Sequence, residues 1–196
     1  KAINLLKKDN PKHILDVATG TADMAIMTCK MLDPEKIDGI DISVGMLDLG
    51  RKKIEKEQLT HKIALHTGDS ETIKFEDNTF DAITVAFGVR NFADLEKGLA
   101  EMYRVLTPGS KIVILEFSQP SQFWFKPIYN IYMKWITPNI GKLFSGNKAA
   151  YAYLNESVIA FPEGTAFLSI LEKAGFKNIH QQKLSLGICS IYCGDK

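Results

Sequence analysis

The stretch "ILDVATGTADMAI", residues 14–26, has the pattern of a buried strand that leads into a helix. Its apolar first half leads into Asp16, a turn of small residues follows at Gly20 and Thr21, and apolar residues then return at helical spacing. A buried strand that enters a helix through such a turn is typical of open α/β sheets, which bind ligands at the carboxyl ends of their strands. The stretch therefore raises the question of which ligand binds beside a carboxylate and a small-residue turn.

Apolar runs of strand length alternate with helical patterns along the first 118 residues. Ser43 and Asp94 are the expected N-caps of the second and third helices, and "TPGS" (107–110) ends the third. Such alternation predicts a parallel sheet with helices on both faces. We expect strands at 13–18, 36–41, 62–67, 80–87 and 111–118, and helices at 23–32, 43–57 and 94–106.

The chain changes character after residue 118. Residues 122–136 are rich in aromatics with interspersed lysines, and we expect an aromatic lid or insert at about 119–155. A helix is expected at 163–174, and the extended runs 176–185 and 187–193 close the chain as an antiparallel hairpin at the sheet edge. The predicted fold is α/β, a mostly parallel seven-stranded sheet in a single domain, 1–196.

Composition limits the function classes. A hydrophobic share of 45% and a net charge of +1 argue against disorder and against a nucleic-acid partner. Cys29, Cys189 and Cys193 form no C-x-x-C motif, and the four histidines are not spaced as metal ligands, so we expect a reduced, metal-free, cytoplasmic protein. The opening "KAINLLKK" looks like the second half of a helix, so we expect an upstream segment. The sequence does not indicate an oligomeric state.

The first turn disfavours a dinucleotide. Ala22 stands where a G-x-G-x-x-G turn has its second glycine, and the carboxylates of Asp16 and Asp23 oppose a phosphate. S-adenosylmethionine has no phosphate, and its sulfonium and amino groups accept acidic neighbours. The turn therefore favours S-adenosylmethionine as the cofactor.

Two further strand ends suit the same cofactor. Asp41 ends the second predicted strand and suits the ribose diol, while Asp69 follows the third and suits the adenine amino group, with Ser70 beside it. Each residue also has a plain structural explanation, because Asp41 is near a helix start and Asp69 near a turn. Acidic residues at three successive strand ends nevertheless make a cofactor site the better interpretation.

Several longer stretches carry a family resemblance that covers essentially the whole chain. They include "LDVATGTAD" (15–23), "GIDISVGML" (39–47), "FGVRN" (87–91) and "YAYLNESVIAFP" (151–162), of which the last two are the most specific. In these stretches the chain resembles the class I methyltransferases and, more closely, the ubiquinone/menaquinone C-methyltransferases.

The resemblance implies methyl transfer from S-adenosylmethionine to a ring carbon of a prenylated quinol, demethylmenaquinol to menaquinol. It also implies contacts of Thr21, Asp41, Asp69 and Ser70 with the cofactor, and extra helices upstream of residue 1. Peripheral contact with the inner face of a membrane is left open. The complete set of cofactor-binding candidates is Asp16, Gly20, Thr21, Asp41, Ile42, Asp69 and Ser70.

The implied chemistry assigns roles to four further residues. A phenolate is a better carbon nucleophile than a phenol, which ionises near pH 10, and a nearby cation favours the anion. Arg90 is the candidate cation and Asn91 the candidate that orients the ring oxygen. The alternative is that Arg90 only pairs with a structural carboxylate such as Asp94. Tyr151 and Tyr153 are candidates to line the substrate cleft, and 122–136 is too short to span a bilayer.

Three other functions stay open at this stage. A methyltransferase of another apolar acceptor, such as a sterol, fatty acid or phenol, uses the same cofactor site. A nicotinamide-dependent oxidoreductase is disfavoured by the broken glycine turn. A module that binds the cofactor without catalysis is the third.

Overall fold

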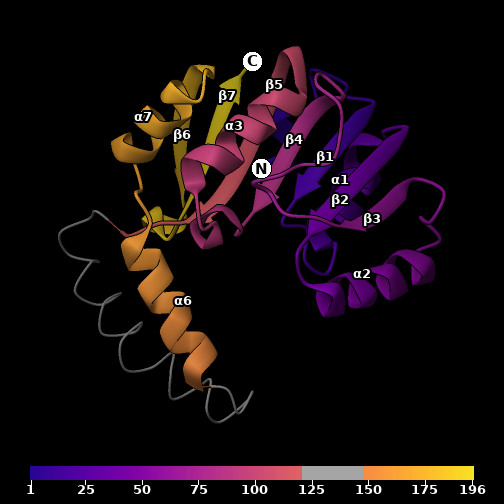
Figure 1. The fold of residues 1–196 in the computed structure, drawn as a ribbon, viewed down its shortest axis with the longest axis horizontal. Helices are drawn as coiled ribbons and strands as arrows, with labels where there is room; N and C mark the ends of the chain where they lie inside the picture. Colours follow the sequence, from indigo (N-terminus) through magenta and orange to yellow (C-terminus); the bar gives the residue numbers. More distant parts are fainter. Residues whose placement is uncertain (121–147) are drawn as a thin grey trace.

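The strand patterns of the sequence form one seven-stranded sheet in the order β3-β2-β1-β4-β5-β7-β6 (Figure 1). The computed structural model describes residues 1–120 and 148–196, without the side chains of 148–152. The strands are β1 (His13–Val17), β2 (Lys36–Asp41), β3 (Ile63–Thr67), β4 (Phe80–Ala86), β5 (Leu106–Phe117), β6 (Lys177–Leu184) and β7 (Cys189–Asp195). The helices are α1 (Asp23–Leu32), α2 (Val44–Lys56), α3 (Leu95–Val105), α6 (Lys148–Ala160) and α7 (Thr165–Lys173), with short 3-10 turns η1 (Ile3–Leu5), η2 (Val89–Asn91) and η4 (Ser185–Gly187).

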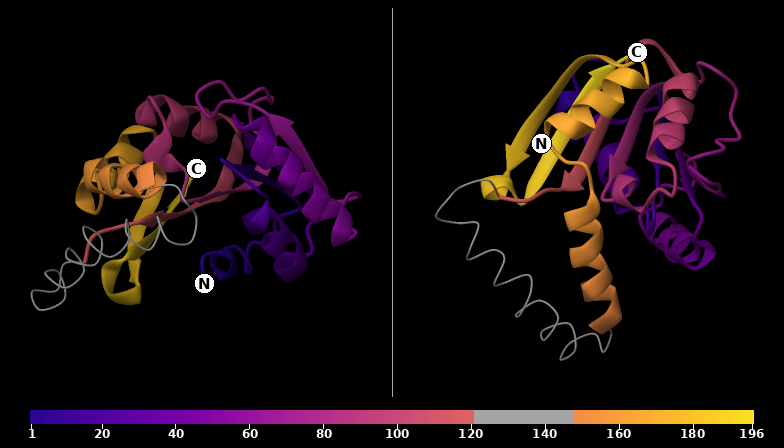
Figure 2. Two further views of the ribbon diagram at one scale, coloured as in Figure 1. Left: turned by 90° about the horizontal axis from the view of Figure 1, so that it is seen from below. Right: turned by 60° about the vertical axis from the view of Figure 1, so that its left-hand side comes forward.

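The sheet is buried on both faces, as the continuous apolar runs predict. Ile14 packs in one core cluster with Ala25 of α1, whereas its neighbour Leu15 packs in the other with Leu99 of α3. Successive strand residues point to opposite faces, so one apolar run supplies both clusters. Helices α1 and α3 therefore cover opposite faces of the sheet (Figures 1 and 2).

The helix boundaries follow the predicted caps. The Ser43 hydroxyl accepts from the amide of Met46 (3.4 Å) at the start of α2. The Asp94 carboxylate accepts from the amide of Lys97 (3.0 Å) at the start of α3. Both side chains satisfy amides that the first helical turn leaves without a partner. Asp41 is therefore not the cap of α2, and its carboxylate serves the turn beside it.

The last two strands form the predicted antiparallel edge. β7 lies between β5 and β6 and runs antiparallel to both. β5 is longer than expected, because Leu106 already pairs with Phe80 before an irregularity after which Lys111 pairs with Ala82. The "TPGS" stretch therefore lies inside this strand, with Gly109 in the left-handed region (φ 80°).

Helix α6 is the element that the sequence analysis missed. It extends away from the body of the sheet beyond the carboxyl ends of the parallel strands (Figure 2). The aromatic run 122–136 lies outside the described residues, as does most of the expected insert at 119–155. None of the helices in the described ranges combines the length and the apolar character needed to cross a membrane.

Candidate active site

The turn after β1 is built from residues with unusual backbone conformations. Gly20 has a φ of 55°, and a Cβ at this position would lie 2.8 Å from the Met46 side chain. Ala18 and Ala22 also have positive φ (53° and 62°), which side-chain-bearing residues rarely adopt. Such conformations cluster at functional sites, where the surrounding structure holds them.

The end of β4 approaches this turn closely. A Cβ on Gly88 would lie 2.5 Å from the Cβ of Ala18, so only glycine fits between the two turns. Phe87, just before it, has a φ of 58° and donates its amide to Leu115 (2.7 Å) on β5. The carboxyl ends of β1 and β4 therefore meet at one place, where open α/β sheets bind ligands.

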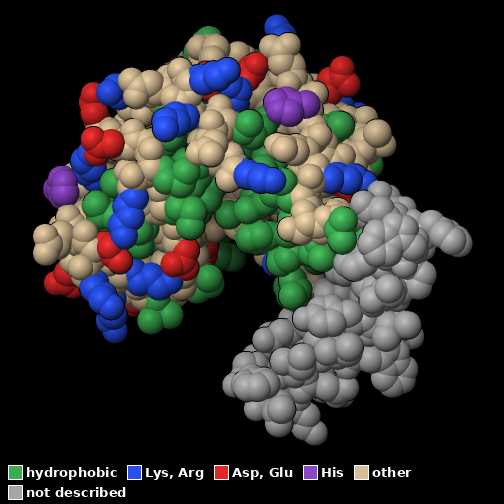
Figure 3. All heavy atoms as spheres, turned by 180° about the vertical axis from the view of Figure 1, so that it is seen from behind, with side chains coloured by type: hydrophobic (Ala, Val, Ile, Leu, Met, Phe, Trp, Pro, Cys, Tyr) green, Lys and Arg blue, Asp and Glu red, His purple; other side chains and the backbone are tan. Residues whose placement is uncertain are grey.

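A cavity of about 750 Å³ opens at this place. All seven cofactor-binding candidates line it, together with Asn91. Figure 3 shows hydrophobic side chains gathered around a hollow on the lower side of the molecule. Met27 of α1 and Met46 of α2 have exposed side chains and line the cavity. Apolar residues, most of which the sequence analysis did not single out, make up much of the wall: Met24, Met27, Ile40, Met46, Phe87, Phe92 and Leu115.

Asp16 is the most buried carboxylate in the cavity wall, with 1% of its surface exposed. Its two oxygens accept from the hydroxyls of Thr19 and Thr84, each at 2.6 Å. Burial raises the pKa of Asp16 to about 6, and the charge of Asp41 raises it as well, against the lowering effect of the two hydroxyls. A cationic ligand offsets this cost, so the sulfonium and amino groups of S-adenosylmethionine fit the site.

Asp41 links the first two strand ends. One carboxylate oxygen accepts from the amide of Gly20 (2.9 Å), and the other accepts from the amide of Ser43 (2.8 Å). Each carboxylate oxygen has a second lone pair. Asp41 is therefore fixed in direction and still able to accept from the two hydroxyls of a ribose.

The remaining cofactor candidates lie on either side of Asp41. Asp69 is exposed, and its carboxylate accepts from the amide of Glu71 (2.9 Å). The Thr21 hydroxyl donates to Asp23 (2.7 Å) and accepts from Lys53 (2.8 Å), which also pairs with Asp23. Lys53 thus neutralises part of the negative charge that the sequence analysis assigned to this turn.

Arg90 does not line the cavity. It pairs with a buried structural carboxylate, as the alternative interpretation expected, but this carboxylate is Glu116 and not Asp94. Its guanidinium pairs with Glu116 (2.7 Å) and donates to the carbonyl of Phe87 and to the Ser157 hydroxyl of α6 (3.3 Å). Glu116 is fully buried and also accepts from the backbone amide of Arg90 (3.2 Å). Burial raises the pKa of Glu116, an effect that the Arg90 charge opposes.

Glu116 was not among the predicted site residues, although its position in the sequence carried a signal. It is the single acidic residue in the apolar run 111–118, where an unpaired charge is costly. Its partner Arg90 is 26 residues away, which local spacing does not reveal.

The two tyrosine candidates lie on α6. Tyr153 is 57% exposed, and its hydroxyl donates to the Asn91 side chain (3.1 Å). It does not line the cavity but joins α6 to a residue that does. The side chain of Tyr151 lies outside the described part of the chain.

Solved structures similar to this chain include S-adenosylmethionine-dependent methyltransferases and a cyclase. A SAM-dependent methyltransferase from Aquifex aeolicus is 22% identical with a TM-score of 0.66, covering 99% of this chain and 88% of that chain. The [4+2]-cyclase SpnF has a TM-score of 0.71 at 16% identity, covering 99% of this chain and 80% of that one. Such likenesses show the fold alone. The fold is that of a class I S-adenosylmethionine-dependent methyltransferase, and the acidic cavity lies where such a fold binds its ligand.

The chain belongs to the ubiE/COQ5 methyltransferase family, which matches residues 1–196. It is 48% identical to the demethylmenaquinone methyltransferase of Bacteroides fragilis over 196 residues, all of this chain and 80% of that protein. The demethylmenaquinone methyltransferase of Thermus thermophilus is 41% identical, with 88% of it covered. The ubiquinone/menaquinone biosynthesis C-methyltransferase UbiE of Geotalea daltonii is 43% identical, with 83% covered. The chain is thus an S-adenosylmethionine-dependent methyltransferase.

Proposed function

We propose that this enzyme methylates a ring carbon of a prenylated quinol, converting a demethylmenaquinol to a menaquinol. The observation that carries the proposal is the cavity, in which carboxylates from three strand ends face an apolar wall. Relatives whose names state demethylmenaquinone methylation support the choice of acceptor. A benzoquinol acceptor belongs to the same proposal, because one relative is named for both pathways.

The proposed cofactor contacts divide the ligand into three parts. Asp16 faces the cationic methionine end, and Asp41 accepts from the ribose hydroxyls. Asp69 and Ser70 bind the adenine edge, with the exposed Ile42 against its ring. Gly20 and Thr21 let the backbone approach the ligand closely. The opposite charges of ligand and carboxylates, the acceptor geometry of Asp41 and the cofactor's lack of a phosphate all favour this assignment.

The acceptor must be the reduced quinol, because the oxidised ring is electrophilic. When bound, S-adenosylmethionine supplies the methyl group, whose bond to sulfur breaks as the bond to the ring carbon forms. The ring carbon then loses its proton to water or to a basic group of the site, which restores the aromatic quinol. The protein's part in this chemistry is to hold the ring in line with the methyl group and to favour its anion.

Asn91 is the proposed contact for the quinol oxygen. It lines the cavity, and its side-chain oxygen accepts from the Tyr153 hydroxyl (3.1 Å), so its amide nitrogen is the group that can donate to a phenolate. The direct action of the Arg90 charge on that phenolate stays a prediction. The ion pair with Glu116 favours a positioning role, in which Arg90 fixes the turn that presents Asn91.

The apolar wall is the proposed path for the prenyl tail. Met24, Phe92 and Leu115 give it a surface that repels water. Since a prenylated quinol resides in lipid, we include peripheral membrane contact in the proposal.

The direct test is transfer of a labelled methyl group from S-adenosylmethionine to chemically reduced demethylmenaquinone. We expect label in the quinol ring with the reduced acceptor and none with the oxidised one, because only the reduced ring is nucleophilic. Reduced demethylated benzoquinol, a sterol and a fatty acid are the comparison acceptors. Label in a sterol or fatty acid but not in either quinol would refute the proposal.

A further inference from the structure

The segment that carries Asp69 and Ser70 has no regular structure of its own. Residues 68–79 connect β3 to β4 without a helix or strand. Near the cavity the segment is held by Gly68, whose amide donates to the carbonyl of Asp41 (3.0 Å), and by the turn at Asp69. A loop of this kind needs contacts from elsewhere to keep its ligand-binding residues in place.

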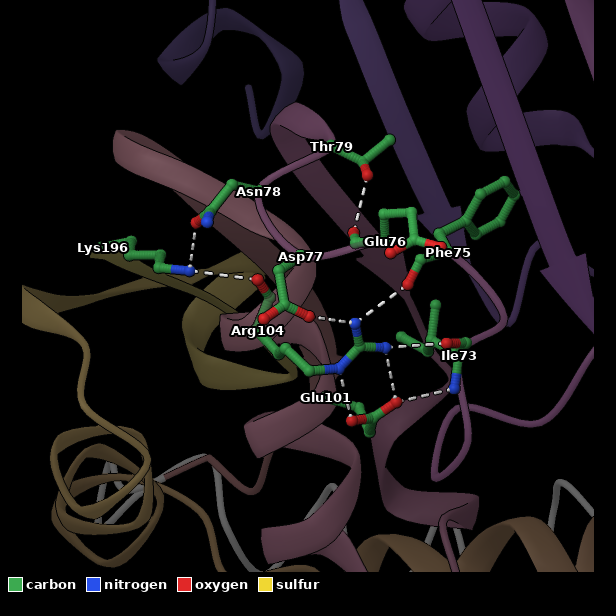
Figure 4. Close-up of polar contacts among 9 residues, drawn as sticks. All are labelled: Ile73, Phe75, Glu76, Asp77, Asn78, Thr79, Glu101, Arg104 and Lys196. Atoms are coloured by element: carbon green, nitrogen blue, oxygen red, sulfur yellow. Dashed lines mark hydrogen bonds and ion pairs between the residues drawn. The ribbon is translucent and has the colours of Figure 1, made fainter.

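Two side chains of α3 bind the backbone of this segment (Figure 4). The Arg104 guanidinium donates to the carbonyls of Ile73 (2.8 Å) and Phe75 (2.9 Å). Glu101 accepts from the amide of Ile73 (2.9 Å). Three backbone groups of the segment are therefore held by two charged side chains, neither of which lines the cavity.

The two side chains are themselves fixed to each other. Arg104 donates to both oxygens of Glu101, at 2.8 and 2.9 Å, which is a bidentate pair. Arg104 also pairs with Asp77 (2.7 Å) in the same segment. Because Arg104 and Glu101 lie on one helix and are bound to each other, the guanidinium N–H groups and the Glu101 carboxylate meet the segment in a fixed geometry.

This arrangement differs from an ordinary surface ion pair. Arg104 is only partly exposed, with 31% of its side chain accessible. It donates to backbone carbonyls of a segment in which Ile73 is buried in the core. A second link lies nearer the cavity, where Glu71 accepts from the amide of Asp94 (2.8 Å) just before α3. Helix α3 and the residue before it thus hold the segment at residues 71, 73, 75 and 77.

We propose that Arg104 is a positioning residue for the adenosine end of the cofactor, acting through residues 69–75 without touching the ligand. The inference rests on the proposed cofactor contacts of Asp69 and Ser70. Without Arg104 the segment is free to move. Cofactor binding must then order the segment, and this entropy cost weakens the binding.

The test compares Arg104→Met with the wild-type protein by calorimetry. The ligands are S-adenosylhomocysteine and 5′-methylthioadenosine, which keeps the adenosine but lacks the amino-acid end. We expect Kd to rise about tenfold for both ligands, because the effect lies at the shared adenosine end. With the cofactor at saturation kcat should change less than twofold, so the effect appears in KM for S-adenosylmethionine.

Two variants serve as comparisons. Lys111→Met removes another partly buried ion pair, with Asp9 (2.7 Å), away from the cavity, and should leave both Kd values unchanged. Arg104→Lys keeps the charge but not the planar fork that reaches two carbonyls, so its Kd should stay close to that of Arg104→Met. Hydrogen exchange adds a readout independent of activity, since the amide of Ile73 should exchange faster in Arg104→Met.

The outcomes separate this inference from the proposed function. If the wild-type protein binds neither ligand, the proposed cofactor site is refuted, and the role of Arg104 is refuted as well. If the wild-type protein binds both and Arg104→Met binds them equally well, only the positioning role is overturned. A rise in Kd for S-adenosylhomocysteine alone would also overturn it. Should Arg104→Met fail to fold, Glu101→Gln, which removes the charge behind the fork, must show the same matched rise.

Discussion

The protonation of Asp16 should be linked to cofactor binding, because a cationic ligand favours the charged carboxylate. Its pKa is raised to about 6 by burial, so in the unliganded protein it takes up a proton as the pH falls below about 6. We predict that the affinity for S-adenosylmethionine falls with pH below about 6, because the protonated carboxyl no longer attracts a cation. Asp16→Asn should bind about 10- to 100-fold more weakly at pH 8, with no such pH dependence.

Calorimetry at pH values between 5 and 8 measures this difference, with 5′-methylthioadenosine as the control ligand that lacks the cationic end. Equal pH profiles for Asp16→Asn and the wild-type protein would contradict the role given to Asp16.

The same ionisation has a consequence for stability. The folded pKa lies above the unfolded one, so folding favours the protonated form; the stabilising contribution is complete below about pH 4 and is lost as the pH rises through about 6. The charged carboxylate thus costs the unliganded protein about 3 kcal/mol at neutral pH. Asp16→Asn should remove that cost, which means that a weaker-binding variant is the more stable protein without ligand.

At the scale of elements, the Arg90–Glu116 pair joins three parts of the fold. It lies between the η2 turn, the end of β5 and, through Ser157, helix α6. Removing one partner leaves a buried charge alone, so Glu116→Leu and Arg90→Met should each cost about 3–5 kcal/mol of unfolding free energy. The double variant should regain most of this stability, because apolar side chains replace both charges.

Turnover should not recover in the double variant. The turn that presents Asn91 loses the Arg90–Glu116 ion pair in all three variants, and kcat should stay about 10- to 100-fold below wild type. Denaturant unfolding and the methyl-transfer assay measure the two quantities on the same samples. A double variant as active as the wild-type protein would reduce the pair to a structural role.

Elements were predictable wherever one local pattern was decisive. The apolar runs gave the strand positions, and Ser43 and Asp94 gave two helix starts, because caps act within one helical turn. Helix α6 was missed because it extends from the body and leaves Tyr153 and Ile159 exposed, so its sequence lacks a clear apolar face. The absence of Gly and Pro between 148 and 160 was the available signal.

The site was predictable only in part, because local sequence patterns do not reveal contacts between residues far apart in the chain. Residues that follow strand ends meet at one edge of a parallel sheet, so Asp16, Asp41 and Asp69 were expected to lie together, and all three line the cavity. The partners that hold this edge come from far along the chain. Arg104 binds a carbonyl 31 residues away, and no local period marks such a contact.

At the scale of the whole molecule, one arrangement links the fold to its chemistry. The sheet order brings β1, β2 and β4 side by side, so their carboxyl ends form the edge of one cavity. The central claim is that a cationic nucleoside without phosphate binds across this edge with its ribose on Asp41. The proposed positions of the quinol ring and of its prenyl tail depend on that placement.

A crystal structure of the protein with S-adenosylhomocysteine tests the claim most directly. We expect both ribose hydroxyls within hydrogen-bonding distance of the Asp41 carboxylate, with the adenine beside Asp69. A nucleoside bound elsewhere, or an Asp41 side chain turned away from it, would refute the proposed cofactor site.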